Sequence, residues 1–396
     1  MTDTPKKTLV RRAPWPASIS RPVVTPLQMS VVYASECPDQ LDAQYAGRVP
    51  GYTYAREGHP NADMLSRMID GLEGVEGGLI VGSGMAAVTA ALMGLLSAGD
   101  HVIGADQLYG RSLRLMTQDL ARFGIETSTA DPTDANAIAA AIRPNTKVII
   151  IEIVSNPTLR LADMEGIAKL TRAKGITLVV DNTFTTPRGF QPIAHGADVV
   201  LHSVTKMLAG HADVTLGYVA ARDPAQRKAI YDFAVTTGLT PSPFDCWLAE
   251  RGMYSFTLRY DRAEQNAARL ADHLASLTGV KRVLYPTRAD HPDHNRAQHL
   301  LQGRGGHMVS FELTGGRDAA NALTRAMPDV AFAPTLGDIG TTLSHPASSS
   351  HRNVAQAARA AVGISEGFFR ISVGCEEIEI LLDDFTRGVK AAAEVG

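Results

Sequence analysis

The chain has 396 residues and a formal net charge of −3 at pH 7, with 45% hydrophobic and 20% charged residues. One hydrophobic core rarely supports that length, so we expect a large domain and a smaller one. The composition is typical of a globular protein and argues against extensive disorder. The slight negative charge offers no basic field to a phosphate backbone or an anionic bilayer, so neither nucleic acid nor membrane is expected as a partner.

The three cysteines, Cys37, Cys246 and Cys375, are far apart and form no CxxC pair. Neither a disulfide framework nor a thiolate metal site follows, so we expect a cytoplasmic protein without a metal. The basic N-terminus precedes no apolar segment, and the chain has no apolar run long enough to span a bilayer. The sequence therefore predicts neither an export signal nor a membrane span.

Residues 1–57 contain seven prolines and no sustained periodicity, which is typical of an arm that lies on another surface. The run 61–74 then places apolar residues on one helical face, with Asn61 as the expected N-cap and Gly74 as the expected stop. The sequence therefore predicts an arm followed by a helix.

Continuous apolar runs begin at residues 78, 101, 147, 176, 197 and 214, and helical segments separate several of them. This alternation predicts a mostly parallel sheet covered by helices on both faces. Ligands of such sheets bind beyond the carboxyl ends of the strands. The rule points to residues 82–85, Asn156, Asp181 and 203–206. A second unit, with strands near 307–313 and 367–374, is expected after residue 255.

Lys206 follows the apolar run that begins at residue 197. A buried lysine is costly unless it is paired or neutral, and burial lowers its pKa, as Schiff-base chemistry requires. The alternative is a loop lysine with its amine in water. Asp181, which lies 25 residues earlier, also ends an apolar run. Its carboxylate suits the nitrogen of a pyridinium ring, or it caps a helix or turn.

The segment "VGSGMAA" places a glycine-rich turn between a strand and a helix, where free amides can bind a phosphate. It lacks the spacing of the dinucleotide and P-loop motifs. Ser203 and Thr205 add hydroxyl donors, and Arg56 can add a bidentate charge.

Together these features resemble the Cys/Met-metabolism family of pyridoxal-phosphate enzymes, which includes cystathionine synthases and lyases, methionine gamma-lyase and acylhomoserine sulfhydrylases. The segments that occur in family order are "YTYAREGHPN", "GSGMAA", "LYG", "SNPT", "VVDNTF", "HSVTKMLAGHAD", "SPFDCWL" and "FFRISVGCEE". The resemblance implies the α/β fold of PLP-dependent aminotransferases (fold type I), with a mostly parallel seven-stranded sheet. It also implies three parts: an N-terminal arm at 1–57 that contributes to the neighbouring subunit, a PLP-binding large domain at 58–255, and a small C-terminal α/β domain at 256–396.

The resemblance assigns the cofactor pyridoxal 5′-phosphate. Lys206 would bind it as a Schiff base and shuttle protons, and Asp181 would pair with the ring nitrogen. The phosphate would be held by Gly84, Met85, Ser203 and Thr205.

Substrate contacts are implied in the same way. Tyr109 would stack on the ring and assist proton transfer to the departing group. Asn156 would lie near the ring oxygen or the substrate carboxylate, and Arg370 would clamp that carboxylate. Thr335 belongs to the loop that distinguishes substrates.

Family members complete the site across a dimer interface. Tyr54 and Arg56 would reach the cofactor phosphate of the neighbouring subunit, and the expected assembly is a homotetramer, a dimer of dimers. His202, His211 and His345 are interpreted as structural.

The substrate loop at 335–352 departs from the family pattern. Thr335 replaces a serine, and Gly340 replaces the glutamate of cystathionine- and methionine-processing relatives. The lysine that O-succinylhomoserine sulfhydrylases carry at the position of Gly340 is also absent. The uncharged position fits another group on a homoserine-type oxygen or sulfur, including a bulky or cationic group such as the guanidinooxy group of canavanine. Arg111 replaces the cysteine of methionine gamma-lyase, which weakens the case for methionine.

The sequence thus favours a PLP-dependent gamma-lyase acting on an O- or S-substituted homoserine-type amino acid such as canavanine, methionine or cystathionine. The alternative is gamma-replacement, by an O-succinylhomoserine or O-acetylhomoserine sulfhydrylase or a cystathionine gamma-synthase. A third hypothesis is a non-catalytic binding module. The joint presence of Lys206, Asp181, Tyr109 and Arg370 argues against it.

Overall fold

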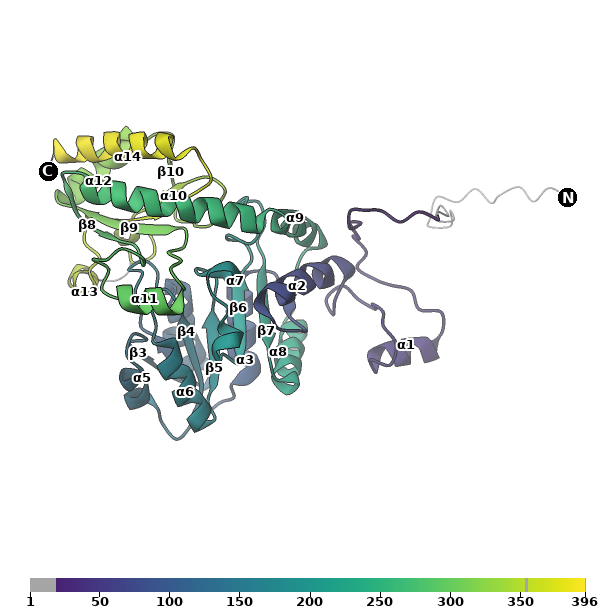
Figure 1. Cartoon of the computed structure of the whole chain (residues 1–396). Helices are drawn as coiled ribbons and strands as arrows, with labels where there is room; N and C mark the ends of the chain where they lie inside the picture. The colour runs from purple at the N-terminus through teal and green to yellow at the C-terminus, as the bar shows by residue number, and fades with distance from the viewer. Residues whose placement is uncertain (1–18, 353–354, 396) are drawn as a thin grey trace.

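The computed structural model describes residues 19–352 and 355–395, which form two sheets with their helices and an N-terminal arm (Figure 1). The larger sheet has the strand order β1-β7-β6-β5-β4-β2-β3. Its strands are β1 (Leu79–Val81), β2 (His101–Ala105), β3 (Glu126–Ala130), β4 (Thr146–Glu152), β5 (Thr177–Asp181), β6 (Val199–Ser203) and β7 (Gly217–Ala221). Strands β2 to β6 pair in parallel, and β7 runs opposite to its neighbours β6 and β1. The predicted mostly parallel, seven-stranded sheet is confirmed.

Helices bury the apolar strands of this sheet on both faces. They are α2 (Pro60–Glu73), α3 (Gly84–Leu95), α4 (Gly110–Arg114), α5 (Ala135–Ala141), α6 (Met164–Lys174), α7 (Thr186–Gly189), α8 (Pro224–Thr236) and α9 (Pro243–Met253). One buried cluster joins α2 and α9 to side chains of β6 and β7, and another joins α3 and α6 to the central strands. The two clusters hold the carboxyl ends of β4, β5 and β6 in fixed positions.

The start of α2 differs from the prediction. Its N-cap is His59, whose Nδ1 accepts the Ala62 N–H at 3.2 Å, so the expected Asn61 cap is wrong. Asn61 instead donates to the Pro26 carbonyl and accepts the Gln28 N–H, both at 3.0 Å. It therefore ties the arm to the helix. The expected stop at Gly74 is confirmed, because this C-cap residue has a φ of 69°.

The second sheet has the order β10-β11-β12-β9-β8 and packs against helices that lie above it in Figure 1. Its strands are β8 (Val280–Leu284), β9 (Met308–Leu313), β10 (Ala331–Phe332), β11 (Thr342–Ser344) and β12 (Phe368–Ser372). The helices of this part are α10 (Phe256–Ser276), α11 (His294–Leu300), α12 (Gly316–Ala326), α13 (Gln356–Ala361) and α14 (Ile378–Ala393). The first half of α10 packs in the core of the large sheet and the second half in the core of the small one. The boundary that we propose after residue 255 therefore falls where this connecting helix begins.

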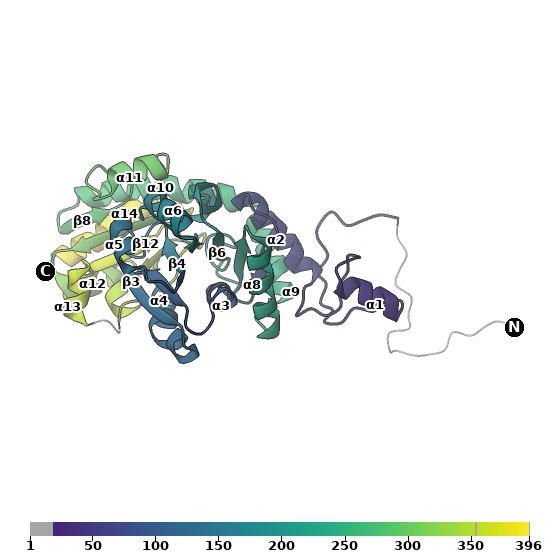
Figure 2. The ribbon, with the colours of Figure 1, turned by 90° about the horizontal axis from the view of Figure 1, so that it is seen from below.

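The described part of the arm, residues 19–57, extends away from both sheets in the two views (Figures 1 and 2). It contains a helix that its composition did not predict, α1 (Pro38–Tyr45), with Pro38 at the first helical position. Apolar side chains along the arm, including Met29, Val31 and Val32, are exposed within the single chain.

None of the helices in the described ranges combines the length and the apolar character needed to cross a membrane.

Candidate active site

The carboxyl ends of three neighbouring parallel strands bring Glu152, Asp181 and Ser203 together. Glu152 and Asp181 are paired in register on β4 and β5. Asp181 Oδ1 accepts the Thr183 N–H at 3.0 Å. Burial raises the pKa of the Asp181 carboxyl, and the hydrogen bonds from Thr183 oppose that rise. A carboxylate in this position is stabilised by a cationic partner.

Lys206 lies in the loop that connects β6 to β7. Its Nζ is directed to the Thr335 hydroxyl at 3.4 Å. Burial, and then the positive charge of Arg370, lower the pKa of the Lys206 amine. The buried Arg259 guanidinium donates to the carbonyls of Met207 and Leu208 at 2.8 and 2.9 Å and so fixes the loop. The amine is held in place and is neutral over a wider pH range than an ordinary lysine.

The N-terminus of α3 faces Ser203. Ser83 caps the helix through its Oγ, which accepts the Ala86 N–H at 3.0 Å, and the first amides of α3 have no intrahelical acceptor. A Cβ at Gly84 would lie 2.6 Å from the Cβ of Ser203, so the helix can approach β6 this closely only with glycine at that position. Thr205 Oγ1 donates to the Leu216 carbonyl at 3.1 Å. The helix end and the hydroxyls form a site suited to a phosphate.

Arg370 reaches the same region from β12 of the second sheet. Its Nη1 donates to Asn156 Oδ1 at 2.8 Å and its Nη2 to the Thr335 carbonyl at 2.6 Å. Its Nε is buried and has no hydrogen-bond partner within the described residues. Burial lowers the pKa of Arg370 to about 10, so the guanidinium remains charged at neutral pH. The Nε–H is a donor available to an anionic ligand.

A cavity of about 260 Å³ joins these groups. Its lining includes ten predicted site residues, namely Gly84, Met85, Tyr109, Asn156, Asp181, Ser203, Thr205, Lys206, Thr335 and Arg370. Tyr109 precedes α4, and its side chain is 44% exposed. The roles predicted for these residues remain predictions, but the residues lie around one space.

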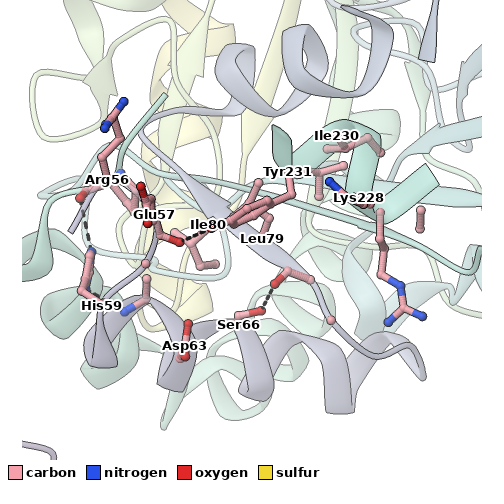
Figure 3. Close-up of a pocket in the computed structure, with 18 of the residues that line it drawn as sticks. Arg56, Glu57, His59, Asp63, Ser66, Leu79, Ile80, Lys228, Ile230 and Tyr231 are labelled. Atoms are coloured by element: carbon pink, nitrogen blue, oxygen red, sulfur yellow. Dashed lines mark hydrogen bonds between the residues drawn. The ribbon is translucent and has the colours of Figure 1, made fainter. Parts of the chain in front are cut away.

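Tyr54 and Arg56 do not line this cavity. The Arg56 guanidinium lies over the Tyr54 ring, 5.4 Å from its centroid. Arg56 borders a second cavity of about 310 Å³, together with Glu57, His59 and residues of α8 (Figure 3). The lysine of that cavity, Lys228, forms an exposed ion pair with Asp232 at 2.5 Å, so it lacks the buried environment of Lys206.

The three histidines interpreted as structural do not line the Lys206 cavity. His202 is buried and contacts Glu73 at 2.5 Å. The Nδ1 of His211 lies 2.7 Å from the Ala209 carbonyl, and His345 contacts Ser348 and the Glu366 carbonyl, both at 2.9 Å.

Sequence reasoning missed four polar residues of the cavity lining, namely Ser112, Glu152, Thr183 and Thr215. Glu152 carries the same signal as Asp181, since it is a charged residue at the end of an apolar strand. Thr183 accepts the Ser203 N–H at 2.7 Å through its hydroxyl, a cross-strand contact that has no local signature in the sequence.

The family described as Cys/Met metabolism PLP-dependent enzyme matches residues 9–390. A cystathionine beta-lyase of Bacillus subtilis is 40% identical over 345 residues, which cover 87% of each chain. An O-succinylhomoserine sulfhydrylase of Pseudomonas aeruginosa is 38% identical over 349 residues, which cover 88% of this chain and 86% of the relative.

The fold is also similar to solved structures. The crystal structure of cystathionine gamma synthase from Xanthomonas oryzae pv. oryzae has a TM-score of 0.89 and 35% identity over 94% of both chains. That of a putative O-acetylhomoserine (thiol)-lyase from Campylobacter jejuni, which contains a pyridoxyl-lysine phosphate, has a TM-score of 0.90 and 28% identity, covering 95% of this chain and 97% of the other. These similarities confirm the predicted fold class.

Proposed function

The chain belongs to the Cys/Met metabolism family of PLP-dependent enzymes, and we propose that within this family it is a gamma-lyase for an O- or S-substituted homoserine-type amino acid. The observation that carries this proposal is the single cavity shared by Lys206, Asp181, the N-terminus of α3 and Arg370. The family uses pyridoxal phosphate, and the matched relatives include cystathionine and methionine lyases and an O-succinylhomoserine sulfhydrylase. The gamma-elimination and the identity of the substrate are the proposed parts.

The residues present fit this cofactor. Lys206 offers an amine with a lowered pKa for an aldehyde, and Asp181 offers a buried carboxyl for a protonated ring nitrogen. Gly84 and Met85 at the N-terminus of α3 line the cavity, where the free amides of the helix end suit a phosphate. The unpartnered Nε of Arg370 supports a place for the carboxylate of the amino acid.

When bound, pyridoxal phosphate supplies an electron sink next to the α-carbon of an amino acid. Lys206 would take the proton from Cα, pass that proton back to the electron sink, and as a neutral amine again would take one from Cβ; its lowered pKa favours the neutral amine that both transfers need. Tyr109, at the exposed side of the cavity, gives a proton to the departing Cγ substituent. Arg370 orients the substrate through its carboxylate, and Asn156 holds the guanidinium.

The substrate loop supports a lyase for a group other than succinyl. A Cβ at Gly340 would have Glu376 Oε1 as its nearest neighbour, at 3.9 Å, so among the described residues there is open space and no cation within 4 Å of this position. Gly340 is not among the residues that line the Lys206 cavity. Its influence on specificity would therefore act at the approach to the cavity. Arg111 is exposed at the start of α4, next to Tyr109 and Gly110.

We also propose a homotetramer in which two subunits complete each site. Tyr54 and Arg56 lie outside the cavity of their own chain, and the arm exposes apolar side chains that a neighbouring subunit can cover. The three free cysteines support a reducing, cytoplasmic location.

A substrate panel tests the proposal. The holoenzyme is incubated with canavanine, cystathionine, methionine and O-succinylhomoserine, with and without sulfide, and the products are identified. Gamma-elimination predicts ammonia and 2-oxobutanoate without sulfide, whereas replacement of the Cγ substituent by water predicts homoserine. Homocysteine formed only in the presence of sulfide would instead establish the sulfhydrylase alternative, and pyruvate would indicate beta-elimination. Purified protein that binds no pyridoxal phosphate would support the non-catalytic alternative.

A further inference from the structure

Glu152 is a buried acid of the cavity to which the proposed mechanism assigns no task. It ends β4 directly opposite Asp181 on β5, and parallel neighbours are about 4.8 Å apart. Glu152 Oε1 accepts the backbone N–H of Tyr109 at 2.8 Å. Its Oε2 is buried and has no hydrogen-bond partner within the described residues. Glu152 thus contacts Tyr109 and lies beside Asp181, and both of these are predicted site residues.

Two carboxylates this close in a buried site are not both ionised at neutral pH. Burial raises the pKa of Asp181, while the hydroxyl and N–H of Thr183, and then His202, oppose the rise. Burial, and then the charge of Asp181, hold the pKa of Glu152 well above its ordinary value, and only the Tyr109 N–H opposes this. The larger rise in the pKa of Glu152, together with the hydrogen bond that Asp181 accepts from Thr183, favours Glu152 as the protonated member of the pair.

The other charged or titratable groups that line the cavity are consistent with a single negative charge on the pair formed by Glu152 and Asp181. Lys206, Arg370 and Tyr109 line the same space, and neither Glu152 nor Asp181 forms an ion pair with lysine or arginine among the described residues. A protonated Glu152 also provides an O–H donor at Oε2, which can satisfy that buried oxygen by a bond to Asp181.

We propose that Glu152 is a positioning residue whose protonated carboxyl holds the backbone of Tyr109 and leaves Asp181 as the only anion facing the cofactor ring. This inference rests on the proposed place of the ring beside Asp181. Ionisation of Glu152 as the pH rises would add a second negative charge next to Asp181 and disturb the ring environment.

The test compares Glu152→Ala with Glu152→Gln in the holoenzyme. Glutamine keeps the acceptor for Tyr109 and a donor for Asp181 but cannot ionise. We expect Glu152→Ala to lower kcat by about tenfold, as the loss of one buried hydrogen bond at the site predicts. Glu152→Gln should restore most of that loss. A pH titration of the visible cofactor band in the wild type should show a change caused by ionisation of Glu152, and Glu152→Gln should lack that change.

Thermal unfolding shows whether both variants are folded, and the visible band shows whether they bind cofactor. Identical pH titrations of the visible band in the wild type and Glu152→Gln, or a Glu152→Ala enzyme with wild-type kcat, would overturn the inference. The variant Asp181→Asn distinguishes a failure of this inference from a failure of the proposed function. If Asp181→Asn keeps the visible band and turnover, the placement of the ring fails. If Asp181→Asn loses them while the Glu152 variants match the wild type, only the role of Glu152 fails.

Discussion

Lys206 differs from Lys228 in its surroundings. The Lys228 side chain is 74% exposed and pairs with Asp232, as a solvated lysine does. Lys206 is largely buried, has no acidic ion-pair partner among the described residues, and shares its cavity with the Arg370 cation. Burial and the like charge both disfavour its ammonium form. The sequence left two possibilities for Lys206, a buried lysine suited to Schiff-base chemistry or a loop lysine with its amine in water. The packing around it favours the buried, reactive lysine.

The environment of Lys206 predicts the pH dependence of cofactor attachment. Only the neutral amine attacks an aldehyde, so the rate at which apoenzyme gains visible absorbance should rise with pH. Its midpoint should lie below the ordinary lysine value of 10.5. Arg370→Ala removes a repulsive cation, stabilises the ammonium and should move the midpoint upward. A midpoint that is unchanged in that variant would contradict the electrostatic coupling.

Arg370 should determine how well the substrate carboxylate binds. Arg370→Lys loses the Nε donor and the bonds to Asn156 and Thr335. We expect KM to rise about 10- to 100-fold, with a smaller change in kcat, because charge-assisted hydrogen bonds of this kind contribute about 1.5–3 kcal/mol. The matched control is Arg188→Lys, a half-exposed arginine paired with Asp261. Steady-state kinetics of both variants provide the comparison, and an equal KM change in the two would argue against the assigned role.

At the scale of elements, the close packing of α3 against β6 requires a glycine at position 84. A side chain at Gly84 meets Ser203 at 2.6 Å, whereas Gly71 on α2 has no neighbouring atom within 4 Å. Gly84→Ala should lower the free energy of unfolding by about 1–3 kcal/mol and weaken cofactor binding, because the helix end must move. Gly71→Ala should raise the free energy of unfolding by up to about 1 kcal/mol. Denaturant unfolding and cofactor titration measure both effects, and a Gly84→Ala protein as stable as Gly71→Ala would refute the close-approach argument.

The central strands could be predicted from the sequence because they are buried on both faces and read as continuous apolar runs. Strand β3, "ETSTA", was not predicted, since it is a polar edge strand with no such run. Glu152 could have been recognised, because it ends an apolar run as Asp181 does. Thr183 and Arg259 could not, because their contacts join segments far apart in the chain and depend on the packed fold.

On the scale of the whole molecule, the arm separates two predicted cofactor residues from the cavity. Residues 19–57 extend from the body (Figure 2), and Tyr54 and Arg56 lie near the C-terminal end of this segment in the sequence. Their exposure in the single chain is consistent with a role in a neighbouring subunit, and composition alone did not predict where they would lie.

A complementation experiment tests the shared site. Lys206→Ala and the double variant Tyr54→Ala/Arg56→Ala should each be nearly inactive alone. After they are unfolded together and refolded, mixed dimers should contain one intact site, so activity should recover to about a quarter of the wild-type value for random pairing. Each variant refolded by itself is the control. Full activity of the double variant alone, or no recovery in the mixture, would contradict a site completed by two subunits.

The central claim is that the amine of Lys206 binds the cofactor covalently, and peptide mapping after borohydride reduction of the holoenzyme tests it most directly. The account predicts a reduced pyridoxyl-phosphate group on the peptide that contains Lys206, and loss of this adduct together with the visible band in Lys206→Ala. An adduct on any other lysine, or a visible band that survives in Lys206→Ala without added amine, would contradict the account.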